Sequence, residues 1–99
     1  MVDPRMTRLA DVLINYSTEV KPGEKILIEA IDVPHAFTTD CVRVAESLGA
    51  QPVVLLKSLE VERALRTHAK QEQYELMAAA ECQLMDNVQC YIGARGGFN

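Results

Sequence analysis

The order of apolar and polar residues predicts a helix at the start of the chain. From Pro4 to about Tyr16, apolar residues recur three or four positions apart, which is typical of an amphipathic helix with one face toward a core. Asp3 is a favourable residue before Pro4, because its carboxylate accepts hydrogen bonds from free N–H groups of the first turn and proline there loses none. The apolar stripe consists of Met6, Leu9, Ala10 and Leu13.

The next segments predict a strand, a helix and a second strand. After a turn at Lys21-Pro22-Gly23-Glu24, residues 26–31 form a nearly continuous apolar run, and residues 52–57 form another. Between the two runs lies a helical stripe that ends at Gly49, a residue that readily adopts the left-handed conformation of a helix end. The stripe consists of Phe37, Cys41, Val44, Ala45 and Leu48. Strand, helix and strand in this order predict a right-handed parallel crossover.

The remaining pattern predicts two helices and a last strand. Ser58 is a suitable N-cap for a third helix, which ends near residues 68–71 and turns Val61, Ala64 and Leu65 inward. A fourth helix follows, with Tyr74, Met77, Ala78 and Met85 on its apolar side. Residues 88–92 predict a third strand, and residues 95–99 an irregular tail.

We therefore predict a single three-layer α/β domain over residues 1–99. It has a short parallel sheet of about three strands and four helices, in the order α-β-α-β-α-α-β. A further helix is expected to cover such a sheet after its third strand. We therefore expect the chain to be a truncated piece of a longer protein.

Charge and cysteine content narrow the classes of function. The net charge is −4 and the cations are dispersed, which argues against nucleic-acid binding. The apolar runs are far shorter than the ~20 residues of a membrane helix. The N-terminus also has an acid, Asp3, where a signal peptide needs cations, and no long apolar run follows it. We therefore expect a cytoplasmic protein without membrane association. Cys41, Cys82 and Cys90 are odd in number and lack C-x-x-C spacing, which predicts buried, reduced thiols.

The carboxyl ends of the strands are the places to look for a binding site, because open parallel sheets bind ligands there. They make Asp32, Ser58, Arg95 and Asn99 the candidate cleft-lining residues. Asp32 also suits a helix cap. The turn at residues 29–34 has no glycine, which disfavours a dinucleotide site.

Other candidate chemistry is sparse. Residues 93–97 are rich in glycine and include Arg95, which suits an anion, but no helix N-terminus follows, so a mobile tail is favoured. His35 and His68 belong to no metal or catalytic motif and are expected on helix surfaces. The sequence thus assigns no catalytic residue and no metal ligand in this chain.

Several short motifs along the chain form a recognisable set. They are Asp3-Pro4-Arg5, Leu9-Ala10, Asn15-Tyr16-Ser17, Val20-Lys21-Pro22-Gly23-Glu24-Lys25, Leu27-Ile28-Glu29, Leu48-Gly49-Ala50 and Pro52-Val53-Val54, continuing through Glu75 and Met85 to Asn99. This set resembles the N-terminus of the thermophilic-type metalloaminopeptidases, peptidase family M29, which includes aminopeptidases T and S. The resemblance covers essentially the whole chain, and its motifs mark a helix end and a turn rather than chemistry.

The resemblance implies a homodimeric enzyme that hydrolyses the N-terminal residue of a peptide substrate. Two divalent metal ions, of the zinc, cobalt or magnesium type, would activate a water molecule. The family's Glu, His and Asp ligands belong to the later part of a longer, two-domain chain. No ligand is therefore carried over to this sequence, and we expect no metal to be bound by it.

Three hypotheses follow. The first is a scaffold domain that is inactive alone and provides one wall of a substrate cleft or a dimer surface. The second is an independent module that binds a small ligand or an anion at the strand ends and Arg95. The third is a protein-interaction or oligomerisation domain, because a truncated sheet leaves an apolar face exposed.

Overall fold

The computed structural model describes residues 4–96 and contains three parallel strands and four α-helices. This confirms the predicted α/β fold and the order of its elements. Asp3, the proposed first cap, and Asn99 lie outside the described residues. In chain order the elements are α1 (Pro4–Val12), the π-helical turn η1 (Leu13–Ser17), β1 (Lys25–Ile31), α2 (His35–Ser47), β2 (Gln51–Lys57), α3 (Leu59–His68), α4 (Gln71–Asp86) and β3 (Cys90–Arg95).

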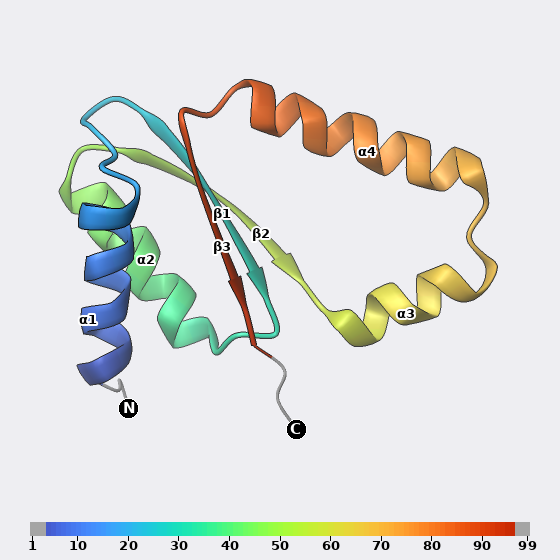
Figure 1. Ribbon diagram of the computed structural model, residues 1–99, viewed down its shortest axis with the longest axis horizontal. Coiled ribbons are helices and arrows are strands. Elements are labelled where there is room, and N and C mark those ends of the chain that lie inside the picture. The colour runs from blue at the N-terminus through green and yellow to red at the C-terminus, as the bar shows by residue number, and fades with distance from the viewer. Residues whose placement is uncertain (1–3, 97–99) are drawn as a thin grey trace.

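The sheet has the strand order β2-β1-β3, so β1 is its central strand. Ile28 of β1 is in register with Val54 of β2 and with Ile92 of β3. Figure 1 shows α1 and α2 together on one side of the sheet and α3 and α4 on the other. Between Pro4 and Gly96, no helix is both long and apolar enough to cross a membrane.

The core lies between the sheet and the helices α1 and α2. Its largest fully buried side chains are Ile14, Ile26, Ile28 and Cys41. Burial raises the pKa of the Cys41 thiol to about 11, with a smaller contribution from the neighbouring Asp40. Cys41 is therefore the buried, reduced thiol that the sequence predicts. The same prediction is wrong for Cys82, which is exposed on α4.

Two glycines shape the loops at the amino end of the sheet. Gly23 (φ 85°) and Gly49 (φ 81°) both adopt the left-handed conformation that disfavours side chains. The N–H of Gly23 donates to the carbonyl of Gly49 at 2.9 Å. A Cβ atom on Gly49 would lie 3.2 Å from Cβ of Pro22, so the two loops also pack closely.

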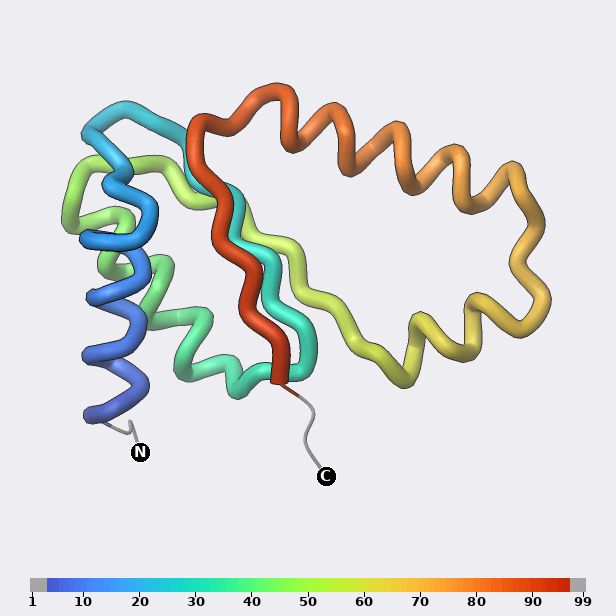
Figure 2. Tube along the Cα trace, viewed as in Figure 1, coloured from blue at the N-terminus to red at the C-terminus, as the bar shows by residue number. Residues whose placement is uncertain are grey.

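The layer formed by α3 and α4 stays open. Neither α3 nor α4 contains a buried residue, and both helices stand away from the sheet (Figures 1 and 2). The radius of gyration is 14.8 Å, against about 12.6 Å for a compact chain of this length. The surface area is 6932 Å², against about 5,600 Å² for a compact protein of this mass. Val61 and Leu65, predicted on the inner face of α3, are 58% and 54% exposed because nothing described packs on them.

Candidate functional site

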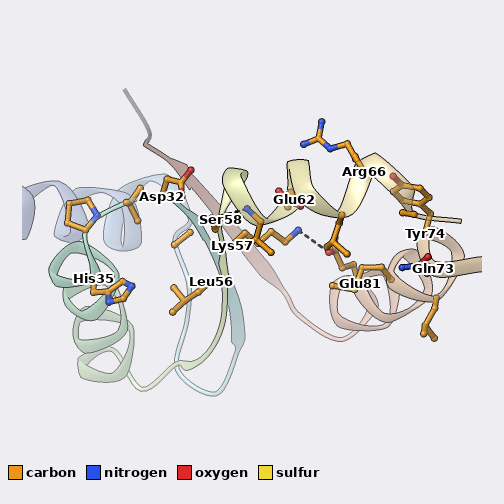
Figure 3. A pocket seen from close by; sticks show the side chains of 18 residues that line it. Asp32, His35, Leu56, Lys57, Ser58, Glu62, Arg66, Gln73, Tyr74 and Glu81 are labelled. Atoms are coloured by element: carbon orange, nitrogen blue, oxygen red, sulfur yellow. Dashed lines mark hydrogen bonds and ion pairs between the residues drawn. The ribbon is translucent and has the colours of Figure 1, made fainter. Parts of the chain in front are cut away.

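A groove of about 1130 Å³ separates α3 and α4 from the end of the sheet. We call it the α3–α4 groove. It is formed by the loop after β1, the end of β2, and the facing sides of the two helices (Figure 3). The large exposed apolar residues of its lining are Leu56, Val61, Leu65, Tyr74, Leu76 and Met77. All six are substantially exposed, so the groove is an apolar surface without a cover among residues 4–96.

A cluster of four polar side chains ties α4 to the sheet. Nζ of Lys57 lies 2.6 Å from Oε2 of Glu29 and 2.9 Å from Oε2 of Glu81. The hydroxyl of Tyr91 donates to Oε1 of Glu29 at 2.7 Å. The four residues come from β2, β1, α4 and β3, and Figure 3 shows the Lys57 ammonium group reaching toward Glu81. We call this set the Lys57 cluster.

The charges in the Lys57 cluster stabilise one another. The hydrogen bond from Lys57, followed by that from Tyr91, holds the pKa of Glu29 below its ordinary value of 4.5. Hydrogen bonds to Glu29 and then Glu81 raise the pKa of Lys57. The pKa of Tyr91 is raised, mainly because its hydroxyl donates to Glu29. Lys57 therefore stays protonated at neutral pH and holds its two carboxylates, which suits it to a structural role rather than to proton transfer.

Asp32 and Ser58, two of the four candidate cleft residues, line the α3–α4 groove. Both cap α3: Oδ2 of Asp32 accepts from the N–H of Leu59 at 3.2 Å, and Oγ of Ser58 accepts from that of Val61 at 3.3 Å. Ser58 is thus the N-cap that the sequence predicts. Asp32 caps α3 rather than α2, the helix that follows it in sequence. The N-cap position of α2 is Pro34, and no side chain caps that helix.

The other candidate residues are placed elsewhere. Arg95 ends β3, is exposed, and is not among the residues that line the groove. Asn99 lies outside the described part of the chain. His35 and His68 are exposed on helices, as predicted, and His35 borders the groove.

The Lys57 cluster was not predicted from the sequence. Glu29 interrupts the apolar run of residues 26–31, and Lys57 ends the apolar run that begins at Pro52. These charged positions are the signal that points to the two residues. In the sheet register, Glu29 alternates with the core residues Ile28 and Ala30, so its side chain lies on the face opposite the core. Glu81 is 24 residues from Lys57 in sequence, and no spacing rule joins the two.

A smaller hollow of about 290 Å³ lies between α2 and the outer edge of β2. We call it the β2-edge hollow. Its lining residues are His35, Thr38, Thr39, Val42, Val54 and Leu56. His35 and Leu56 also line the α3–α4 groove, so the two spaces meet at the end of β2. Oγ1 of Thr38 is buried and has no hydrogen-bond partner among the described residues.

Comparison with known families decides the assignment. Residues 2–97 match the family model of the thermophilic metalloproteases, M29. The chain belongs to this family. The match confirms the family resemblance drawn from the sequence motifs, and it extends over nearly all of the chain. A search of curated proteins finds no match to the chain.

The metal ions implied by the M29 family do not fit the residues described here. Residues 4–96 contain no group of three or more His, Cys, Asp or Glu side chains placed to hold a metal ion. The carboxylates of Glu29 and Glu81 share one partner, and that partner is the Lys57 ammonium group. An M29 metal centre therefore cannot be built from this donor set without displacing Lys57.

Proposed function

We propose that this M29 chain is the N-terminal scaffold domain of a metal-dependent aminopeptidase, which removes N-terminal residues from peptides. The family match over residues 2–97 carries the proposal. In the parent enzyme, paired divalent ions would activate water and stabilise the oxyanion, and residues outside this chain would hold them. The isolated chain is then inactive.

The α3–α4 groove supports a role as one wall of the substrate cleft. It lies at the carboxyl end of the strands, where open α/β sheets bind ligands. Its exposed apolar lining suits the side chains of a peptide, and Asp32, Ser58 and His35 provide polar groups at its rim. The Lys57 cluster keeps α4 at its present distance from the sheet and so maintains the width of this wall.

The test is an activity assay on the purified chain. We expect no hydrolysis of leucyl-p-nitroanilide above the enzyme-free rate with zinc, cobalt or magnesium added. A second protein, extended by the coding sequence that follows residue 99, should hydrolyse the substrate and lose activity with a chelator. Chelator-sensitive hydrolysis by the 99-residue chain would place the active site within it and contradict the scaffold role.

The exposed groove also favours the third hypothesis, an interaction domain. Its apolar side chains would be buried if a second copy covered α3 and α4. Sedimentation equilibrium tests the interaction domain. A chain that stays monomeric at high concentration removes support for self-association through this groove. The homodimer, the cytoplasmic location and the contributions of Arg95 and Asn99 to a cleft stay predictions.

A further inference from the structure

The outer edge of β2 presents unpaired main-chain groups. On the inner side, the N–H of Gln51 donates to Glu24 at 2.8 Å, and the carbonyl of Lys57 accepts from Asp32 at 3.2 Å. Main-chain groups of successive residues in a strand point in opposite directions. Those of Val54 and Leu56 therefore face away from β1, and β2 has no further strand beside it among residues 4–96. Pro52, which has no N–H, has the same outward orientation, as expected at a sheet edge.

Beyond Pro52, this edge lacks the usual protection against an added strand. Charged side chains commonly guard an edge. The one charged residue of β2, Lys57, is instead held by Glu29 and Glu81. Val54 and Leu56, by contrast, are 37% and 59% exposed. The edge therefore offers both hydrogen-bonding groups and apolar contacts to an incoming chain.

The α3–α4 groove and the β2-edge hollow both reach this edge. Val54 and Leu56 line the β2-edge hollow, and Leu56, Lys57 and Ser58 line the α3–α4 groove. The opposite sheet edge differs, because β3 contributes none of the lining residues of either space. Side chains of an added strand would alternate between the two sides of the sheet. The position of the two hollows thus singles out the β2 edge.

Thr38 provides a separate observation. Thr38 is only 7% exposed and lines the β2-edge hollow. Its hydroxyl oxygen has no hydrogen-bond partner among the described residues. A buried hydroxyl without a hydrogen bond is costly and uncommon. If the Thr38 hydroxyl turned toward the hollow, a polar side chain there would give it a hydrogen-bond partner.

We propose that the outer edge of β2 binds a peptide in extended conformation as an added strand. Val54 and Leu56 would form main-chain hydrogen bonds with alternate residues of the peptide, and one of its side chains would enter the β2-edge hollow beside Thr38. Main-chain pairing explains affinity in this mode, and the hollow explains selectivity. The inference goes beyond the proposed peptidase role, because it requires neither a metal ion nor a free peptide N-terminus.

The probe is an acetylated and amidated peptide of alternating threonine and valine with a lysine at each end. Its blocked N-terminus prevents it from being an aminopeptidase substrate, so binding and the peptidase role are tested separately. In ¹⁵N-edited spectra of the chain, we expect the amides of Val54 and Leu56 to shift and to gain protection from exchange. Amides of Tyr91, Gly93 and Arg95, on the β3 edge, serve as internal controls and should stay unchanged.

Matched variants and peptides make the test decisive. Val54→Pro removes one outward N–H and should weaken binding about fivefold or more, whereas Val54→Thr keeps it and should bind as the parent chain does. N-methylation of the peptide residues whose N–H groups face β2 should abolish binding. N-methylation of the residues between them, whose N–H groups face away, should not. Three outcomes would each overturn the proposal. They are the absence of amide shifts at millimolar peptide, equal shifts at both sheet edges, and equal binding of the two N-methylated peptides. A folded Val54→Thr variant that loses binding would overturn it as well.

Discussion

Nζ of Lys57 lies 2.6 Å from Oε2 of Glu29, and this ion pair joins neighbouring strands on the sheet face opposite the core. Both side chains are 18% exposed, so the pair is partly shielded from water. Glu29→Gln removes the negative charge and leaves Lys57 with Glu81 alone. We expect a loss of about 1–2 kcal/mol in the free energy of unfolding, measured by urea denaturation at pH 7. Tyr91→Phe is the control, because it removes one hydrogen bond to Glu29 but no charge, and it should cost less.

The same pair predicts how stability depends on pH. The pKa of Glu29 is lowered in the folded protein from 4.5, so the unfolded chain takes up this proton first as the pH falls. The contribution of Glu29 is therefore fully present above pH 4.5 and is lost below it, as the pH passes through the folded pKa. Urea denaturation from pH 7 to pH 3 should show the difference between parent and Glu29→Gln shrinking below pH 4.5. A difference that stays constant over this range would contradict the prediction.

The position of α4 should depend on Glu81. Its carboxylate accepts from Lys57 at 2.9 Å, but its side chain is 36% exposed, so solvent screens the interaction. For Glu81→Gln we expect a small loss of about 0.5 kcal/mol and roughly twofold faster amide exchange along α4. Glu75→Gln, an exposed change on the same helix, should leave exchange unaltered. Equal effects of the two changes would show that Lys57 does not hold α4.

Gly96 should be intolerant of a side chain. A Cβ atom there would lie 2.3 Å from the carbonyl oxygen of Asp32, which is main chain and cannot rotate away. Gly96→Ala should therefore break the 2.8 Å hydrogen bond from its N–H to the carbonyl of Ile31. The free energy of unfolding, measured by thermal denaturation, should fall by about 1–3 kcal/mol. Gly93→Ala is the comparison, because its close neighbour at 2.6 Å is the Tyr91 hydroxyl. That hydroxyl ends a side chain that can rotate away, at the loss of its hydrogen bond to Glu29, so this change should cost less. The reverse order would contradict this packing.

Local patterns predicted the elements of the fold because each depends on nearby residues. The apolar run of β1, Ser58 at the start of α3 and Gly49 at the end of α2 all appear where the sequence places them. The open third layer was not predicted, because an apolar stripe such as Val61 and Leu65 indicates that a helix face can be buried but does not supply what covers it.

The candidate site was predicted only in part. Asp32 and Ser58 follow from the rule that ligands bind at strand ends, and both line the α3–α4 groove. The partnership of Lys57 with Glu81 depends on the path of the chain through α3 and α4, which residue spacing does not encode. The same holds for Asp32 and Leu59, which lie 27 residues apart and meet because β1 and β2 end side by side.

The Asp32 cap leads to the last prediction, which separates hydrogen bonding from backbone strain. Asp32 has φ 55°, a conformation that Asn tolerates, Gly adopts freely and Ala adopts at a cost of roughly 1 kcal/mol. Asp32→Asn keeps an oxygen for the N–H of Leu59 and should change the free energy of unfolding by only a few tenths of a kcal/mol. Asp32→Gly loses the cap alone, at about 1 kcal/mol, and Asp32→Ala loses the cap and adds the strain, at about 2 kcal/mol.

Urea denaturation measures the stabilities of the three Asp32 variants and so tests their order. Amide exchange at Leu59 reports on the cap directly. Exchange should accelerate in Asp32→Gly and Asp32→Ala but not in Asp32→Asn, because the Leu59 N–H loses its acceptor only in the first two. If Asp32→Asn were as unstable as Asp32→Ala, the negative charge of Asp32 near the N-terminus of α3 would be the dominant contribution instead of the hydrogen bond. Raising the ionic strength would then reduce the difference between Asp32 and its Asn variant, whereas a cap based on the hydrogen bond would leave it unchanged.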